Sequence, residues 1–164
     1  MRVIGIDPGS RYTGYGIIER VGPKLRHVAS GRINATKGES FADRLDLIYT
    51  GLATILEEYP CQEGAIESIF TARNAMSTIK LGQARGVALL AAKHQGLALA
   101  EFAPSEIKQA VTGSGRATKE VVTAMVKTIL RIEGDLSEDA GDALALAICH
   151  LNTSSFLSRL KETP

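Results

Sequence analysis

The first apolar run of the chain, VIGID at residues 3–7, ends in a carboxylate. Its β-branched residues predict a buried strand, and the sequence PGS directly after it predicts a turn. An ionised, unpaired carboxylate beside a buried strand is strongly destabilising, so Asp7 requires a partner. Either Asp7 accepts hydrogen bonds from the backbone of the turn, or the fold brings a compensating cation to it.

The remaining segments follow a definite order of strand and helix patterns. Residues 13–20 and 26–34 are expected to continue from the first strand as an antiparallel meander, because short Gly and Pro turns separate them. Single strands are expected at 65–68 and 98–102. Helical periodicity predicts helices at residues 41–59, 74–95, 104–111, 118–132 and 137–150. This order predicts an α/β fold, a mixed sheet with helices on its faces.

Two of the predicted helices carry further local signals. Ser40 and Asp43 have the spacing of a capping pair at the start of helix 41–59. In helix 74–95 the sequence GVALLAAK is almost entirely apolar. Such a segment is buried either by the sheet or by another subunit.

The length and composition of the chain indicate one globular unit. With 164 residues, of which 45% are hydrophobic, we expect a single domain over residues 1–151 and a flexible polar tail over residues 152–164. Cys61 and Cys149 show neither a disulfide pattern nor metal-ligand spacing, which favours reduced thiols. The N-terminal residues do not show the pattern of a signal peptide, and no apolar run is long enough for a membrane-spanning helix. We therefore expect a cytoplasmic protein that does not associate with membranes.

The net charge of +1 hides a segregation of charge along the chain. Residues 38–63 carry six acidic side chains against the single basic Arg44. Residues 68–119 carry seven basic side chains against Glu101 and Glu106. This distribution is consistent either with a cationic surface for a polyanion or with ordinary solvated helix faces.

Three further carboxylates stand at positions where the pattern calls for an apolar or a structural residue. Glu67 ends the apolar strand GAIES, and Asp139 and Asp142 are three residues apart, on one face of the last predicted helix. We expect Gly141 and the glycines after Asp7 to allow close approach of the backbones. Clustered carboxylates repel one another unless a cation neutralises them, and Mg²⁺ prefers oxygen ligands. The set therefore predicts a divalent-metal site, although Asp139 alone has a structural alternative at the helix N-terminus.

Five segments, in this order and spacing, resemble the RuvC crossover-junction endodeoxyribonucleases of bacteria: GIDPGSRYTGYG, AIESIFTARN, KLGQARGVALLAA, GSGRATKEVV and EDAGDALALAICH. The resemblance covers nearly the whole chain. It implies a ribonuclease-H-like fold, with a five-stranded mixed sheet of three antiparallel strands followed by two parallel ones and helices on both faces. It also implies a homodimer that binds Holliday junctions and nicks two opposing DNA strands symmetrically during recombination and repair. Residues 81–92 are our candidate for the dimer interface.

The resemblance also implies roles for individual residues. The metal-binding catalytic acids of the family fall on Asp7, Glu67, Asp139 and Asp142, with two Mg²⁺ ions in each site and Mn²⁺ as a substitute. The adjacent Glu138 leaves open which of Glu138 and Asp139 faces the metal. A branch-migration motor complex is the implied protein partner. The family's aromatic that stacks on unstacked bases falls on Phe70, and its phosphate-binding lysines fall on Lys108 and Lys119, with a core aromatic and a solvated helix residue as the alternatives for Phe70 and Lys119. Further DNA contacts are expected within the basic segment, at Arg73, Asn74, Lys80, Arg85 and Arg116.

Two other functions remain open from the sequence. A non-catalytic junction-binding scaffold of the same fold would be expected to lack one or more of the acids, and all four are present. A ribonuclease-H-like nuclease acting on RNA would be expected to lack the long apolar helix and the loop before Lys119. His150 has no role that we can derive from the sequence, and a histidine near a helix end is usually structural.

Overall fold

The computed structural model describes residues 1–68 and 74–161, with side chains as far as Ser154. Phe70 and Arg73 therefore lie outside the described residues. A single five-stranded sheet has the strand order β3-β2-β1-β4-β5. Strand β1 pairs antiparallel with β2 and β2 with β3, whereas β1 pairs parallel with β4 and β4 with β5. The strands are β1 (Arg2–Asp7), β2 (Tyr12–Val21), β3 (Lys24–Asn34), β4 (Glu63–Glu67) and β5 (Leu99–Phe102).

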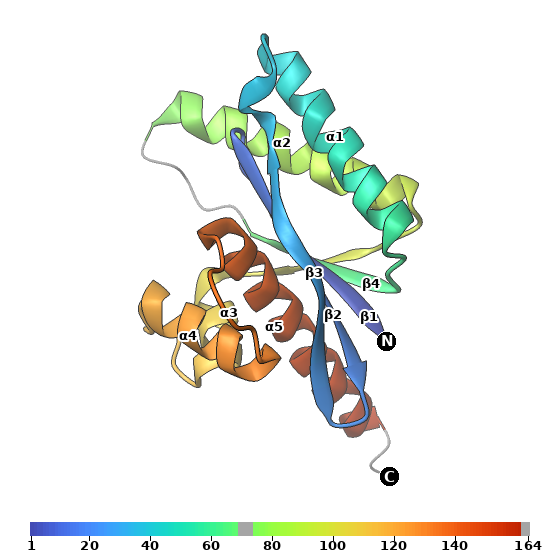
Figure 1. Cartoon of the computed structure of the whole chain (residues 1–164), viewed down its shortest axis with the longest axis vertical. Helices are drawn as coiled ribbons and strands as arrows, with labels where there is room; N and C mark the ends of the chain where they lie inside the picture. The colour runs from blue at the N-terminus through green and yellow to red at the C-terminus, as the bar shows by residue number, and fades with distance from the viewer. Residues whose placement is uncertain (69–73, 162–164) are drawn as a thin grey trace.

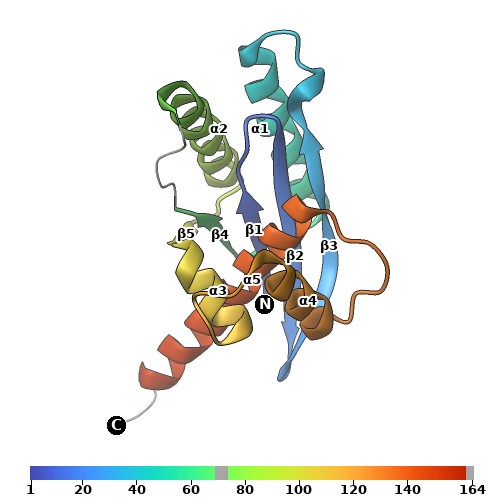
Figure 2. The ribbon, with the colours of Figure 1, turned by 90° about the vertical axis from the view of Figure 1, so that its left-hand side faces the viewer.

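Helices cover both faces of this sheet (Figure 1). One face carries α1 (Phe41–Glu58) and α2 (Ala75–His94), which pack on each other and on the sheet. The other face carries α3 (Pro104–Thr112), α4 (Lys119–Leu130) and α5 (Glu138–Lys161), as the turned view in Figure 2 shows. The expected mixed sheet and its helical layers are confirmed.

Local sequence explains how these elements begin and which side they bury. The capping box at Ser40 and Asp43 is present, because each side chain bonds to the other residue's backbone N–H. Alternation along β1 sends Val3 to the α5 side and Ile4 and Ile6 to the α1 and α2 side. Each face of the sheet thus has its own apolar core, and Asp7 follows Val3 and Gly5 onto the α5 side.

Helix α5 lies unusually close to the sheet because glycines face it. A Cβ on Gly5 would lie 1.9 Å from the carbonyl oxygen of Ala143, and one on Gly14 would lie 2.1 Å from that of Asp139. At Gly16 the nearest atom is the backbone nitrogen of Leu144, at 2.6 Å. The expectation for Gly141 was wrong, since a Cβ there would meet the Leu136 and Thr123 side chains at 3.5 and 3.9 Å, which are ordinary contacts. The close approach comes from the sheet glycines.

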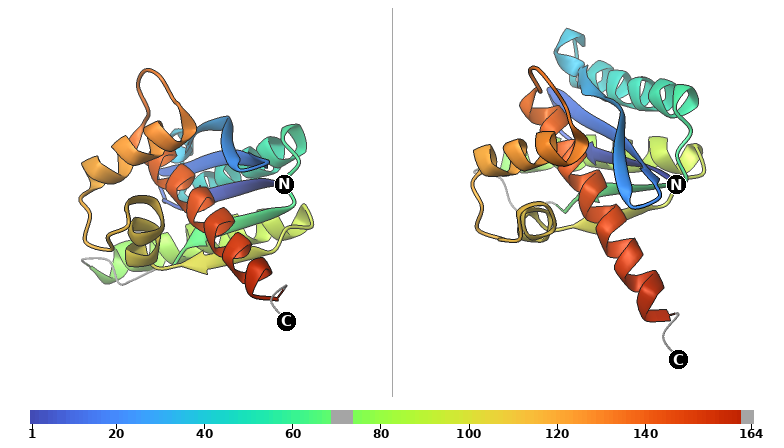
Figure 3. Two further views of the ribbon diagram at one scale, coloured as in Figure 1. Left: turned by 90° about the horizontal axis from the view of Figure 1, so that it is seen from below. Right: turned by 60° about the horizontal axis from the view of Figure 1, so that its bottom comes forward.

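The largest departure from the predicted elements is the length of α5. The sequence predicted a helix over residues 137–150, whereas α5 is Glu138–Lys161 and extends past the edge of the sheet (Figure 3). Residues 152–161, expected to be a tail, are therefore helical. The hydroxyls of Thr153 and Ser154 donate to the carbonyls of Cys149 and His150, so these polar residues are compatible with the helix. A short 3₁₀ helix, η1 (Ala35–Lys37), was also not predicted.

No helix in the described part of the chain is both long enough and apolar enough to cross a membrane.

Candidate active site

Two of the predicted acids lie at the ends of neighbouring parallel strands. The register pairs Ile6 of β1 with Ile66 of β4, and the next residue along each strand is the acid. Neighbouring strands are about 4.8 Å apart, so Asp7 and Glu67 end side by side at one edge of the sheet. Both side chains line a cavity of about 280 Å³.

Helix α5 brings the other two acids to the same edge. Asp142 lines the cavity with Asp7 and Glu67, and the charge of Asp139 acts on Asp7. The Glu138 side chain is 70% exposed and pairs with Lys119, the lysine that also pairs with Asp142. The charges of Glu138 and Asp139 both raise the pKa of Asp142, and that of Asp139 also raises the pKa of Asp7. The glycine contacts in β1 and β2 set this placement, because they fix the backbone of α5 against the strands.

The electrostatics of the site reflect partly buried acids that lie close to one another. Burial, followed by the charges of Asp142, Glu67 and Asp139, raises the pKa of Asp7 from 3.8 to about 7. Burial and the charge of Asp142 likewise raise the pKa of Glu67. The pKa of Asp142 is also raised, mainly by burial and despite the opposing effect of Lys119. Each carboxyl group is thus harder to ionise here than in water.

Two lysines face the carboxylates from the helical side. Lys119, at the start of α4, lies with its ammonium 2.9 Å from Asp142 Oδ2, and it also pairs with Glu138. Although partial burial would lower the pKa of Lys119, these two ion pairs raise it. Lys108 on α3 lines the same cavity, and its charge partly offsets the rise in the pKa of Glu67. The sequence predicted both lysines, and the fold places both beside the acids.

The donor set fits a hard divalent cation in chemistry but is not closed into a ligand shell. The side chains that converge are carboxylates, which suit Mg²⁺ or Mn²⁺ rather than softer metals. Within residues 1–68 and 74–161, no three Asp, Glu, His or Cys side chains are arranged so that they could hold one ion together. Asp142 Oδ2 is already paired with the Lys119 ammonium. A metal ion at Asp142 would therefore compete with Lys119 for this carboxylate.

The other expected DNA-contact residues have varied surroundings. Arg116 is exposed in the loop before α4, and Lys80 is exposed on α2, with its ammonium 5.7 Å from the ring centre of Phe41. Asn74 caps α2 by accepting from the Ser77 N–H. Arg85 is only 15% exposed, pairs with Glu101 at 2.6 Å and donates to the Glu67 carbonyl. Asn74 and Arg85 thus have structural contacts that account for them, and Arg85 supports the end of β4.

Arg32 is a neighbour of the site that sequence reasoning missed. It lies on β3, with its guanidinium 3.6 Å from Asp139 Oδ2 and 4.4 Å from the ring centre of Tyr12. Nothing in the linear sequence points to this contact, because it depends on the register of β2 with β3 and on the position of α5. Knowledge that Gly14 pairs with Arg32 would have been needed to find it.

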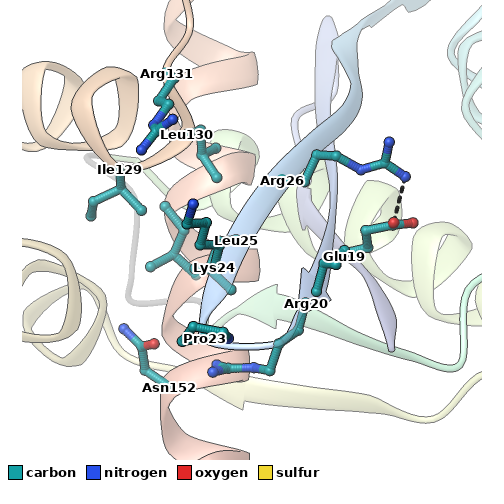
Figure 4. Close-up of a pocket in the computed structure, with 12 residues that line it drawn as sticks. Glu19, Arg20, Pro23, Lys24, Leu25, Arg26, Ile129, Leu130, Arg131 and Asn152 are labelled. Atoms are coloured by element: carbon teal, nitrogen blue, oxygen red, sulfur yellow. Dashed lines mark hydrogen bonds and ion pairs between the residues drawn. The ribbon is translucent and has the colours of Figure 1, made fainter.

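A larger cavity, of about 910 Å³, lies at the opposite end of the strands (Figure 4). The β2–β3 hairpin, the end of α4 and α5 line it, and none of the four acids does. Nearby at the start of β4, His150 Nε2 lies 2.6 Å from Glu63, and the His150 ring meets that of Phe102 edge-on. His150 therefore ties α5 to β4 and β5, which is a structural role.

Comparison with known proteins gives a consistent result. Residues 3–150 match the family Crossover junction endodeoxyribonuclease RuvC. The chain is 50% identical over 160 residues to the crossover junction endodeoxyribonuclease RuvC of Hahella chejuensis, with 98% of this chain and 92% of that protein covered. It is 49% identical over 161 residues to the protein of the same name from Geobacter sulfurreducens, with 98% of each covered.

Solved structures show the same similarity. The chain resembles Thermus thermophilus RuvC in complex with Holliday junction substrate, with a TM-score of 0.89 and 30% identity over 95% of this chain and 96% of that one. The yeast mitochondrial Holliday junction resolvase Ydc2 has a TM-score of 0.70 at 13% identity, covering 98% of this chain and 83% of that one, which shows the fold alone. The ribonuclease-H-like α/β fold implied by the sequence motifs is confirmed.

Proposed function

The chain belongs to the RuvC family of crossover junction endodeoxyribonucleases, and from this membership we propose how it resolves Holliday junctions. It hydrolyses one phosphodiester in each of two opposing strands, with divalent metal ions held by Asp7, Glu67, Asp139 and Asp142. Junction resolution is the activity of the family, so a non-catalytic scaffold or an RNA nuclease is not favoured. The identity of the ions, the roles of the residues and the assembly are the parts that we propose.

The observation that carries the metal proposal is the state of Asp7. Its carboxyl group is buried beside Glu67, Asp142 and Asp139, and its pKa is raised to about 7. A fold that places acids where they repel one another requires a compensating cation to keep them ionised at neutral pH. Mg²⁺ fits because carboxylate oxygens are its usual protein ligands and because it retains water, and Mn²⁺ has similar ligand preferences.

When bound, two such ions supply an activated water and stabilise the charge on the leaving oxygen. The four carboxylates hold their positions at the edge of the sheet through β1, β4 and α5. Asp142 would hold the ions together with the other carboxylates, and the neighbouring ammonium of Lys119 would contact the DNA phosphate. Lys108 binds phosphate from the α3 side of the same cavity.

The DNA surface extends from these lysines. We place Arg116 and Lys80 among the phosphate contacts because both side chains belong to exposed residues of the basic segment. Phe70 and Arg73, outside the described residues, keep their predicted roles in stacking and phosphate contact. Such contacts release counterions, so junction binding should weaken steeply with salt.

We propose a homodimer, because paired nicks on symmetry-related strands require two active sites related by a twofold axis. The alanine face of α2, with Ala84, Ala88, Ala91 and Ala92, is buried within the chain. The side of α2 away from it exposes three large apolar side chains, Met76 at 61%, Ile79 at 55% and Leu90 at 49%. An interface on α2 would therefore use this exposed face, of which Leu90 belongs to the predicted segment 81–92.

Cleavage of a synthetic mobile four-way junction tests the proposal. Wild type and Asp7→Asn are compared in Mg²⁺, with linear duplex and RNA–DNA hybrid as control substrates. We expect paired nicks on opposing junction strands by wild type, and no nicks but retained junction binding by Asp7→Asn. Cleavage by wild type in EDTA, or unchanged cleavage by Asp7→Asn, would contradict the metal mechanism.

A further inference from the structure

Arg32 lies in line with the catalytic acids across three strands of the sheet. Asp7 pairs with Gly14, and Gly14 pairs with Arg32. Directly paired residues point to the same face of a sheet, so Asp7 and Arg32 both face α5. Neighbouring strands are about 4.8 Å apart, which puts the two Cα atoms about 10 Å apart. Gly14 has no side chain between them, and the backbone of Asp139 occupies that space.

The guanidinium of Arg32 contacts Tyr12 and Asp139 and is otherwise exposed to solvent. Its Cζ atom lies 4.4 Å from the ring centre of Tyr12, a diagonal neighbour on β2. One nitrogen lies 3.6 Å from Asp139 Oδ2, and the side chain is 50% exposed. A guanidinium has five N–H donors, so the Tyr12 and Asp139 contacts leave donors free for a further anion. The aromatic contact restricts the side chain in advance of any ligand.

The Arg32–Asp139 ion pair is weak, so its guanidinium can readily take another anion in place of Asp139. Exposed ion pairs contribute about 0–1 kcal/mol, because water competes for both groups. Phosphate is a better partner for a guanidinium, since two parallel N–H donors match two phosphate oxygens. Asp139, in turn, is freed for the metal site when Arg32 moves to a phosphate.

The position of Arg32 also supplies positive charge on the side of the carboxylates opposite the two lysines. The two lysines of the site, Lys108 and Lys119, approach the carboxylates from α3 and α4. A DNA strand that crosses these acids has negatively charged phosphates on both sides of them. On the β3 side, Arg32 is the cation that the structure places in contact with the carboxylate cluster.

We propose that Arg32 is a further DNA-contact residue, which binds a backbone phosphate of the junction on the β3 side of the carboxylates and releases Asp139 as it does so. This inference rests on the proposed function, because it takes the acids as the point where a DNA strand crosses the protein.

The test measures binding without catalysis, by fluorescence anisotropy of a labelled four-way junction in EDTA at about 0.1 M salt. Arg32→Ala is compared with Arg32→Lys and with Arg26→Ala. Arg26 is a matched control, since it is an exposed arginine on the same strand, is paired with Glu19 and lies toward the other end of β3. The thermal midpoint of each variant shows that folding is retained.

We expect Arg32→Ala to weaken junction binding about eightfold, the effect of one phosphate contact at a slope near 0.9 and 0.1 M salt. The slope of log K against log salt should fall by about one, Arg32→Lys should keep most of the affinity, and Arg26→Ala should stay within about twofold. The loss caused by Arg32→Ala should be larger in an Asp139→Asn background, where no carboxylate competes for the guanidinium.

Equal binding by Arg32→Ala and Arg26→Ala, together with slower cleavage in Mg²⁺ by Arg32→Ala, would overturn the inference and leave Arg32 as a residue that only orients Asp139. Equal salt slopes for Arg32→Ala and wild type would also overturn it. A wild-type protein that binds the junction without cleaving it would contradict the metal mechanism instead. The binding comparison in EDTA would still decide the role of Arg32 in that case.

Discussion

The ammonium of Lys119 lies 2.9 Å from Asp142 Oδ2, and both side chains line the cavity that Asp7 and Glu67 also line. The pair neutralises part of the negative charge that the four acids bring together. It also makes the Lys119 ammonium a competitor of the metal ion for Asp142, because both cations bind the same carboxylate. Lys119 should therefore weaken metal binding to the DNA-free protein while it strengthens DNA binding.

Replacing Lys119 with Gln should therefore change metal affinity and cleavage in opposite directions. Removal of the positive charge should tighten Mn²⁺ or Mg²⁺ binding to the DNA-free protein by about three- to tenfold, since the pair is only half-buried. Cleavage should slow because a phosphate contact is lost. Titration calorimetry and junction cleavage measure the two effects. Lys127→Gln, on the same helix but bonded to the Gly134 carbonyl, is the control, and weaker metal binding by Lys119→Gln would disprove competition.

Asp139→Asn should abolish cleavage, whereas Glu138→Gln should reduce it by no more than about threefold. The charge of Asp139 acts on Asp7, while the Glu138 side chain is 70% exposed and contacts Lys119. An exposed pair of this kind contributes little. Single-turnover cleavage of the junction at saturating protein is the measurement. The opposite order of the two variants would show that α5 presents Glu138 to the metal.

The metal-free protein should lose stability as pH rises from about 4 to about 7. The folded state keeps the proton of Asp7 up to about pH 7, whereas the unfolded chain releases it near 3.8, so the folded state binds more protons in this window. Asp7→Asn should therefore stabilise the protein in EDTA at pH 8, on the order of 4 kcal/mol, and have little effect at pH 4. Urea unfolding at both pH values measures this difference. A stabilisation that is the same at pH 4 and pH 8 would assign it to packing rather than to ionisation.

Gly5→Ala should destabilise the fold by at least about 3 kcal/mol, because its Cβ would lie 1.9 Å from the Ala143 carbonyl oxygen and force α5 away from the sheet. Gly141→Ala is the matched control on the helix side of the same layer. Its Cβ would meet the Leu136 and Thr123 side chains at 3.5 and 3.9 Å, both ordinary contacts, so the helix should gain about 0.5–1 kcal/mol. Chemical unfolding in EDTA gives both values, and similar losses for the two variants would contradict the glycine contact.

Ile79→Glu combined with Leu90→Glu should convert the dimer to a folded monomer. Both side chains are about half exposed in the single chain, so the charges should disrupt an interface more than the fold. Light scattering after gel filtration gives the mass, and circular dichroism gives the helix content. Val21→Glu, at an equally exposed apolar position on the β2–β3 hairpin, should remain dimeric. A wild-type monomer at micromolar concentration would contradict the proposed assembly.

The sequence determined much of the architecture because its signals are local. The apolar run of β1, the Gly and Pro turns around β2, the capping pair at Ser40 and the periodicity of α1 each depend on residues close together in the chain, and each predicted element was confirmed within one or two residues. The acids were visible for the same reason. Asp7 and Glu67 interrupt apolar strands, and Asp142 lies in an otherwise apolar helix.

The tertiary structure decided the parts that depend on how distant elements meet. The rotation of α5 pairs Asp139 with Arg32 and Glu138 with Lys119, and backbone contacts at Gly5, Gly14 and Gly16 fix that rotation. The sequence analysis expected close approach both at Gly141 and at the glycines after Asp7, and it was wrong for Gly141, because adjacency along the chain cannot show which residue faces a neighbouring layer. The end of α5 was also missed, since Ser and Thr at residues 153–154 are typical of a tail unless their hydroxyls bond within a helix.

The contacts of the charged residues were likewise not predictable from the sequence and depend on the tertiary structure. Arg85 was expected on the DNA surface by its charge, but the fold turns it toward Glu101 and the end of β4. Arg32 was overlooked because its pairing with Gly14, and through it the line to Asp7, exists only once three strands are in register. The sequence by itself thus determined which elements form and that four acids are out of place in them. Only the tertiary structure decided which acids and cations meet, because that depends on strand register and helix rotation, which no local pattern encodes.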